Sequence, residues 1–513
     1  MTGQARAAWR PGAARLISWL VPALALLFHL ATFRGYGYFR DELYYLANGR
    51  HLGWGYVDHP PLIGFVAALV TNTIGSSLFA IRLLPAVAAA GTAWLAGRIA
   101  REMGGRAYAQ AMAQLCAVLA PGFLGLFGIF SMNAFDLLFW AALWWIAARY
   151  LRTGNERLWL AFGLVAGVGL LNKISVLFAG VGIVAGLIAA GPREPFRKPW
   201  LWAGGVVAGL VFLPHLAWQA AHGWPTLEFI RNATANKNVA FSPAGYLGAQ
   251  VVNTLPVVPV WLAGLGALLA ARGMRPFRAL GWAWLAVLAV MLTTNAKAYY
   301  LVPSFTVLFA AGGLALERLG PSRPAAAARA LAAALVIVVG AVAAPLAKAL
   351  LPEDSLVAYT SRLGMAPPRE ERHEMGRLPQ HFADQHGWPE LAAAIASVYH
   401  SLPAGERERA CIFVQNYGEA GAVDLFGPAL GLPPAICGHN SYHLWGARGC
   451  TGEVLVVLGG DEEEMRAGFA SLERAATFTC TDCMPYENDR PIWIGRGLHP
   501  PLAELWPRLK SFN

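Results

Sequence analysis

Carboxylates are scarce in the first two thirds of this sequence, and three of them fall in one short, aromatic-rich segment. Residues 35–61 carry Asp41, Glu42 and Asp58 directly after the first apolar run, whereas the whole stretch before Pro352 holds only nine Asp or Glu. Ionisable groups beside a bilayer are costly and are usually functional. Adjacent carboxylates point in different directions, so one suits a general base and the other suits metal binding or substrate orientation.

The same segment also allows a structural interpretation. Asp41 and Glu42 could cap a helix and pair with Arg40, and these residues alone do not decide between cap and catalyst. Asp58 and His59 precede two prolines that fix a rigid entry into the next segment. This second pair could bind a divalent cation or a phosphate, although capping explains it more simply.

Further candidates stand at the edges of later apolar runs. Asp136 opens a run in FSMNAFDLLFW, where it serves either the helix dipole or catalysis. Lys173 in GLLNKISVLF and Lys297 in NAKAYYLVPSF, with Tyr299 beside it, suit binding of a lipid phosphate, although snorkelling to headgroups is the alternative. His215 is a third candidate metal ligand with Asp58 and His59, although its position also fits an interfacial belt.

The elements that must position these residues are membrane helices. The chain of 513 residues is 56% apolar and 14% charged, with a mean hydropathy of +0.45, which is typical of a polytopic membrane protein. A spanning helix needs about 20 apolar residues. Eleven spans are predicted over 16–34, 80–98, 107–125, 134–151, 157–172, 174–191, 200–217, 247–271, 279–295, 299–316 and 327–351, with a short interfacial or re-entrant helix over 62–74.

The charge pattern predicts which side each loop faces. The net charge of +10 does not indicate nucleic-acid binding, because Arg and Lys form triplets in every second short loop, as in the positive-inside pattern. With the N-terminus inside, eleven spans place the acids of residues 35–61 on the outer face. Asp136, Lys173 and Lys297 fall on that face too, and there the charge rule disfavours both lysines.

The composition changes at Pro352 to that of a soluble domain. The runs CIFVQN, EVLVVLGG, ATFTCT and PIWIGRGL alternate with helical patterns over 389–402, 461–474 and 501–510, which predicts a small α/β domain. The expected domains are therefore residues 1–351 in the membrane and residues 352–513 outside it. Five of the six cysteines lie in the second, which suits an oxidising compartment, with Cys437–Cys450 and Cys480–Cys483 as candidate disulfides. The CxxC of the second pair could instead bind zinc or exchange thiols, although no second CxxC accompanies it.

Taken in order, these segments resemble the GT-C membrane glycosyltransferases, most closely the bacterial branch of the protein O-mannosyltransferase and aminoarabinose transferase superfamily. The first motif, RDELYYLANGRHLGWGYVDHPPLIGF, is fairly specific, and FSMNAFDLLFW, GLLNKISVLF and NAKAYYLVPSF follow in sequence. NYGEAGAVDLFG, GHNSYHLWG and CMPYENDRPIW in the C-terminal part look like the same subgroup. The resemblance implies a GT-C fold of about 11 transmembrane helices.

The resemblance also implies roles for single residues. Asp41 matches the catalytic base, Glu42 its partner, and Asp136 an acid that opens a later span. Lys173 and Lys297 match basic positions that hold a lipid phosphate, together with Arg40. Relatives often carry Lys where this chain has His59, so a permanent positive charge is lost at that position, and some relatives bind a divalent metal nearby.

The activity implied is inverting transfer of a sugar from a polyprenyl-phosphate donor, at the outer face of a bacterial inner membrane. The acceptor is a glycolipid, a glycan or a protein, and the sequence names neither the acceptor nor the sugar. Two rival interpretations are a secondary transporter, which would show inverted repeats and charges in mid-span, and a non-catalytic scaffold with a periplasmic binding domain. No nucleotide-binding motif is present in the sequence.

Overall fold

The computed structural model describes residues 11–237, 241–365 and 371–513. Its contacts divide the chain into two compact units. The helical unit comprises Met1–Phe33, Arg82–Pro214 and Phe241–Leu350, and the mixed unit comprises Arg34–Ile81, His215–Ala240 and Leu351–Asn513.

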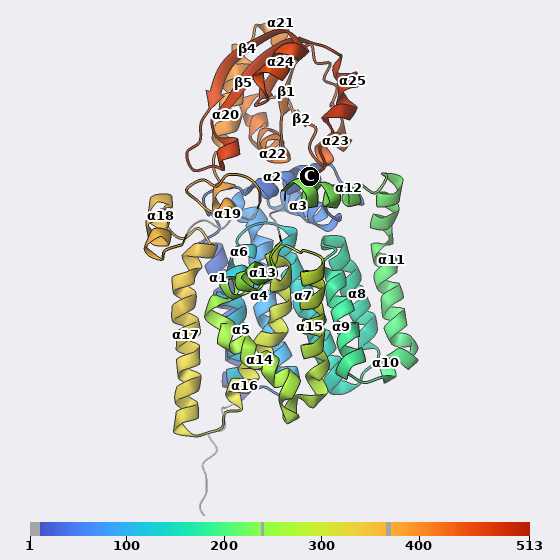
Figure 1. The fold of residues 1–513 in the computed structure, drawn as a ribbon, viewed down its shortest axis with the longest axis vertical. Coiled ribbons are helices and arrows are strands. Elements are labelled where there is room, and N and C mark those ends of the chain that lie inside the picture. Colours follow the sequence, from blue (N-terminus) through green and yellow to red (C-terminus); the bar gives the residue numbers. More distant parts are fainter. Residues whose placement is uncertain (1–10, 238–240, 366–370) are drawn as a thin grey trace, which may run out of the picture. The chain divides into compact units, whose positions relative to one another are not determined.

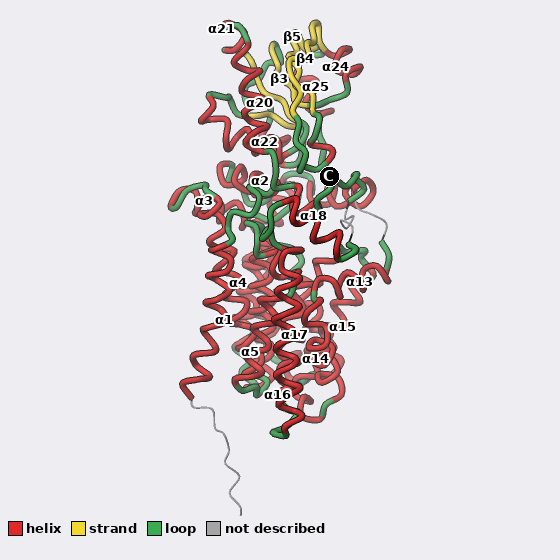
Figure 2. Tube along the Cα trace, turned by 90° about the vertical axis from the view of Figure 1, so that its left-hand side faces the viewer, coloured by secondary structure: helices red, strands yellow, loops and turns green. Residues whose placement is uncertain are grey.

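The helical unit consists of long apolar helices joined by short turns, and no strand occurs in its described residues (Figure 2). Its core is one continuous cluster of apolar side chains, in which Trp140 and Trp144 are fully buried. The helices are α1 (Pro11–Ala31), α4 (Leu78–Glu102), α5 (Ala107–Leu119), α6 (Pro121–Leu126), α7 (Met132–Thr153), α8 (Leu158–Asn172), α9 (Val176–Ala190), α10 (Glu194–Arg197), α11 (Pro199–Ala221), α13 (Pro243–Asn253), α14 (Val258–Ala270), α15 (Arg278–Thr293), α16 (Phe305–Glu317) and α17 (Arg323–Ala347).

Each of the eleven ranges predicted to span a membrane is largely helical. Among the described residues, six helices are long and apolar enough to cross a membrane, or seven if one bent pair counts as a single span. That pair, α13 with Leu255–Ala270, bends by 83° within the predicted span 247–271. Three others, α5, α8 and α9, are shorter than a full span, so the count of eleven remains a prediction.

The mixed unit carries the strands. Its five-stranded sheet has the order β2-β1-β3-β5-β4, with β1 parallel to β2 and β3, and β5 antiparallel to β3 and β4. Helices α20 (Trp388–Ser401) and α22 (Tyr417–Phe426) pack against it (Figure 1). The strands are β1 (Ala410–Val414), β2 (Ala435–Cys437), β3 (Val454–Leu458), β4 (Phe469–Phe478) and β5 (Arg490–Leu498).

The other helices of this unit include elements from early in the chain. They are α2 (Arg40–Arg50), α3 (Leu62–Thr73), α12 (Pro225–Asn232), α18 (Glu353–Arg362), α19 (Gln380–Ala383), α21 (Ala404–Arg407), α23 (Ser441–Trp445), α24 (Glu462–Gly468) and α25 (Leu502–Leu505). The helix predicted over 461–474 was half wrong, because β4 begins at Phe469 and pairs with β5.

One of the two predicted disulfides is confirmed. Cys480 and Cys483 are bonded, whereas Cys450 pairs with Cys411 of β1. The predicted Cys437–Cys450 bond is wrong, since Cys437 is a buried free thiol in the short strand β2.

Candidate functional site

Asp41 lies in the first turn of α2, and a residue from far along the chain holds it. The Tyr417 hydroxyl donates a hydrogen bond of 2.9 Å to Asp41 Oδ1, and Arg40 Nε lies 3.8 Å from the same oxygen. Tyr417 is buried, whereas the Asp41 side chain is 30% exposed. A carboxylate fixed on one oxygen and partly open can accept a proton from a bound group.

Arg40 is the centre of a buried polar network. Its Nη1 donates to the Tyr486 hydroxyl at 2.6 Å, its Nη2 lies 3.8 Å from Asp384 Oδ2, and its guanidinium lies over the Tyr417 ring at 5.4 Å. Burial raises the pKa of Asp384 to about 6, against the opposing effect of Arg40. The guanidinium therefore shares its charge between Asp384 and Asp41.

Two glycines allow α22 to lie beside α2 (Figure 1). A Cβ on Gly418 would meet the Arg40 side chain, and one on Gly421 would lie 2.8 Å from Leu43 Cβ. Asn416 caps α22, since its Oδ1 accepts from the backbone N–H of Gly418 at 2.8 Å. The close approach of the two helices brings Tyr417 within reach of Asp41.

Asp58 and His59 join the same cluster through Tyr44 of α2. The Tyr44 hydroxyl lies 2.9 Å from Asp58 Oδ1 and 2.6 Å from Ser441 Oγ, and its ring stacks on Tyr417 at 4.7 Å. Burial raises the pKa of Asp58, with His59 opposing and Asp41 adding to the shift. The predicted acids Asp41 and Asp58 therefore do lie close together.

The donor set of this cluster does not fit a metal ion. No group of three His, Cys, Asp or Glu with metal-binding geometry occurs in the parts of the chain that the structure describes. Both ring nitrogens of His59 are engaged, Nε2 with Asn48 at 2.9 Å and Nδ1 with the Pro60 carbonyl at 2.8 Å. His215 Nδ1 lies 3.0 Å from the Trp54 carbonyl, so this ring nitrogen is also engaged by the protein.

Glu42 has a local partner. Its Oε2 accepts from the Phe39 backbone N–H at 2.8 Å, and the side chain is buried. This is the helix-capping contact that the sequence allowed as an alternative.

The helical unit gathers the other predicted residues. Lys173 Nζ donates to Asn133 Oδ1 at 2.5 Å and lies over the rings of Tyr300, at 4.2 Å, and Tyr299, at 5.0 Å. Asp136 is buried and accepts from Ser175 Oγ at 2.8 Å. Lys297 directly precedes the 3-10 turn Ala298–Ser304 that carries both tyrosines. The predicted phosphate-binding residues Lys173 and Tyr299 are thus in contact.

Comparison with known proteins finds one family match and several similar proteins. Residues 58–218 match the family model for dolichyl-phosphate-mannose-protein mannosyltransferase. A lipid A galacturonosyltransferase, RgtD of Rhizobium johnstonii, is 28% identical over 204 residues, 39% of this chain and 42% of that protein. ArnT from Cupriavidus metallidurans bound to undecaprenyl phosphate has the same fold, with a TM-score of 0.62, 16% identity, and 93% of this chain and 97% of that one covered.

Residues 58–218 therefore resemble the GT-C membrane glycosyltransferases, and the chain has the fold of ArnT. The arabinofuranosyltransferase AftD from Mycobacteria shares this fold at a TM-score of 0.51 and 15% identity, covering 94% of this chain and 40% of that one. The match covers 42% of RgtD, so the similarity concerns less than half of that relative.

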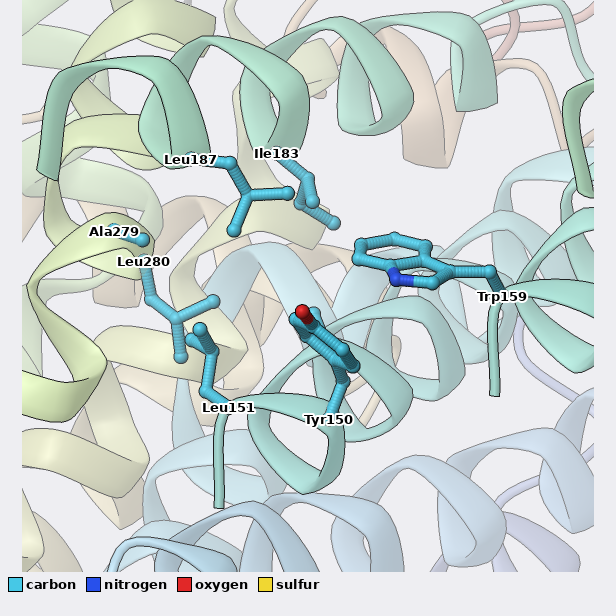
Figure 3. A pocket seen from close by; sticks show the side chains of 8 residues that line it. Tyr150, Leu151, Trp159, Ile183, Leu187, Ala279 and Leu280 are labelled. Carbon is cyan, nitrogen blue, oxygen red and sulfur yellow. The ribbon is translucent and has the colours of Figure 1, made fainter. Parts of the chain in front are cut away.

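Two pockets of opposite character lie in the described part of the chain. An apolar gap in the helical unit is lined by Tyr150, Leu151, Trp159, Ile183, Leu187 and Leu280 with two alanines, and Figure 3 shows no charged group among them. A polar cavity of about 330 Å³ in the mixed unit is lined by Arg40, Asn236, His373, Gln415, Asn416, Tyr417, His439, Tyr486, Arg490, Ser511 and Asn513. Of these two pockets, only the polar cavity is lined by residues near Asp41, namely Arg40 and Tyr417.

Sequence reasoning missed the partners that complete the cluster. Tyr417 and Tyr486 lie in NYGEAGAVDLFG and CMPYENDRPIW, which resemble the GT-C subgroup but were assigned no role. Asp384 and Tyr44 were also missed. A signal for Tyr417 was available, because the glycines spaced by three in NYGEAG mark a helix face suited to close packing.

Proposed function

We propose that this protein transfers a sugar from a polyprenyl-phosphate donor to a hydroxyl of a glycolipid, glycan or protein, with inversion at the anomeric carbon. Asp41 is the general base of this reaction. The observation that carries the proposal is the Asp41 carboxylate, which is partly exposed, held on one oxygen by Tyr417, and near two residues that line a polar cavity, Arg40 and Tyr417.

The chemistry is a single displacement. The acceptor oxygen forms a bond to the anomeric carbon while the bond from that carbon to the phosphate oxygen breaks, and the acceptor proton passes to Asp41. Negative charge grows on the departing polyprenyl phosphate, where a cation stabilises it. Lys173, held by Asn133 against Tyr300, is assigned to this phosphate, with Lys297 as a further cation. Arg40, expected from the sequence to help here, instead pairs with Asp384 and Asp41 and is assigned to orienting the base.

The relatives support both halves of this reaction. The solved ArnT holds undecaprenyl phosphate, and RgtD is named for transfer of galacturonic acid to lipid A. A polyprenyl-phosphate donor and a lipid acceptor are therefore the first pair to test. The same proposal includes an inner-membrane protein of about eleven spans, a membrane domain of residues 1–351, and a periplasmic domain of residues 352–513.

The first experiment reconstitutes the protein in vesicles with polyprenyl-phosphate sugars and measures donor consumption, after mass spectrometry of lipids and glycans from a deletion strain has named the missing product. Asp41→Asn should lower transfer by about 10²–10⁴-fold, the usual contribution of a general base, at unchanged thermal stability. Normal transfer by this variant would overturn the base assignment. A wild-type protein that consumes no donor would favour the scaffold interpretation.

A further inference from the structure

We propose that the polar cavity of the mixed unit binds a saccharide ring, which the C-terminal residues of this chain recognise through its hydroxyl groups. This inference rests on the proposed function and names a substrate-binding subsite for it. The cavity encloses about 330 Å³. That is near the lower end of the range for small-ligand sites, about 300–1,000 Å³.

The charges around the cavity disfavour a bare anion. No Asp or Glu side chain lines it in the described residues, and each of the two arginines that line it lies near an acid that does not. Arg40 lies 3.8 Å from both Asp41 and Asp384, and Arg490 lies 3.8 Å from Glu419. Since each guanidinium charge is balanced, the wall offers hydrogen bonds rather than net positive charge.

The remaining wall is suited to hydroxyl groups. Four amide side chains and one serine line it. The amide of Asn416 already caps α22 and donates to Glu487, and the others offer donors and acceptors to a ring bearing several hydroxyls. The five residues are Asn236, Gln415, Asn416, Asn513 and Ser511.

Aromatic rings supply the apolar part of the wall. The Tyr417 and His439 rings lie 4.8 Å apart, as do the Tyr486 and His373 rings, and all four residues line the cavity. Aromatic side chains present an apolar face together with a polar handle, which matches the apolar C–H face and polar edge of a sugar.

The far wall depends on residues 511–513. Ser511 pairs in parallel with His439, donating its N–H to the Gly438 carbonyl at 2.9 Å, and Asn513 Nδ2 donates to Ser511 Oγ at 3.0 Å. Ser511 can therefore be enlarged to block the cavity without removing any contact of Arg40 or Asp41.

Saturation-transfer difference NMR tests the inference on the full-length protein in nanodiscs. The probes are methyl glucoside, methyl galactoside, methyl N-acetylglucosaminide and galacturonate, with inorganic phosphate as competitor. At least one glycoside should receive saturation in the wild type, lose it in Ser511→Phe and keep it in Ser471→Phe, the same change on the exposed face of β4. Asn513→Ala, which removes one amide only, should weaken the signal if Ser511→Phe does not fold.

Three results would overturn the inference: no probe binds, binding survives Ser511→Phe, or phosphate alone displaces the glycoside. Asp41→Asn should keep the NMR signal while losing transfer, so failure of the subsite and failure of the catalytic proposal are separable. Once the substrates are named, Asn513→Ala shows the source of the ring. It should raise the apparent KM for the acceptor if the ring belongs to the acceptor, and for the donor if it belongs to the donor.

Discussion

The Tyr417 hydroxyl lies 2.9 Å from Asp41 Oδ1, joining residues 376 positions apart in the chain. Tyr417 begins α22, and Asp41 lies in the first turn of α2. The orientation of the proposed base therefore depends on the C-terminal part of the mixed unit as much as on its own helix.

Tyr417→Phe should lower transfer about tenfold, because one hydrogen bond to a charged group contributes roughly 1.5 kcal/mol. Tyr417 acts by positioning, so the test is a double-mutant comparison in the reconstituted assay. In an Asp41→Asn background the same change should have little further effect. Equal effects in both backgrounds would show that Tyr417 acts independently of Asp41.

Gly421→Leu should destabilise the mixed unit and lower transfer together. A Cβ at Gly421 would lie 2.8 Å from the Cβ of Leu43, so a leucine there forces α2 and α22 apart. Overpacking of this kind costs about 1–3 kcal/mol. Thermal unfolding in detergent measures the loss. Gly405→Leu is the matched control, because a Cβ there has open space within 4 Å and should leave stability nearly unchanged.

The stability of the mixed unit should fall as pH rises from about 4, the usual carboxyl pKa of an unfolded chain, through about 6. Burial, and then the neighbouring Glu419, raise the pKa of Glu487, and burial raises that of Asp384 to about 6. A carboxyl group with a higher pKa in the folded than in the unfolded state binds its proton more tightly in the folded protein. Protonation of that group therefore stabilises the fold. Its contribution is complete below the unfolded pKa and is lost as pH rises through the folded one.

Glu487→Gln tests this pH dependence. The amide keeps an oxygen for the Asn416 Nδ2 group, which lies 2.9 Å from Glu487 Oε1, but cannot ionise. Melting temperatures between pH 5 and pH 9 should fall less steeply in the variant than in the wild type. Parallel curves would assign the pH dependence to other groups.

Loss of the Cys480–Cys483 bond should affect transfer more than stability. This bond closes a short loop and should contribute only about 2 kcal/mol to stability in the chain-entropy model. Cys483 lies three residues before Tyr486, whose hydroxyl accepts a hydrogen bond from Arg40, so the bond helps to position that contact. The Cys411–Cys450 bond, with a sequence separation of 39, should contribute about 4 kcal/mol to stability. Each disulfide is replaced by a pair of serines, and the melting temperature and the transfer rate of both variants are measured. Loss of Cys411–Cys450 should lower the melting temperature more, and loss of Cys480–Cys483 should lower transfer more. If one variant is the worse in both measurements, this expectation is wrong.

Lys173→Gln should reduce kcat/KM for the polyprenyl-phosphate donor by about 10–100-fold, the range expected for one charge-assisted hydrogen bond. Lys198→Gln is the control, since Lys198 is 52% exposed and lies 3.7 Å from Glu156. If kcat/KM falls for the acceptor and not for the donor, Lys173 does not bind the donor phosphate.

The sequence predicted the features that local pattern controls. Apolar runs predicted every long helix, whereas the contact between Lys173 and Tyr299 was not predicted. The 83° bend was missed, although Pro256 and Pro259 mark the place where a straight helix loses hydrogen bonds. Disulfide pairing was half wrong, because connectivity depends on which strands become neighbours, and β1 carries Cys411 next to β3.

The contacts of Tyr417 and Asp384 with α2 follow from packing between distant segments. Gly418 and Gly421 permit that packing, but no periodicity within either segment specifies which helix they meet. The proposed base was therefore found from its own motif, while its supporting residues needed the folded chain.

The separation of Asp41 and Tyr417 has a consequence for synthesis. At about 5–20 residues per second, a ribosome needs about 20–75 s to pass from the first residue to the second. During that interval the nascent chain already has its first helices but no oriented base. A chain still being synthesised therefore lacks the contact that orients the proposed base until Tyr417 has been added.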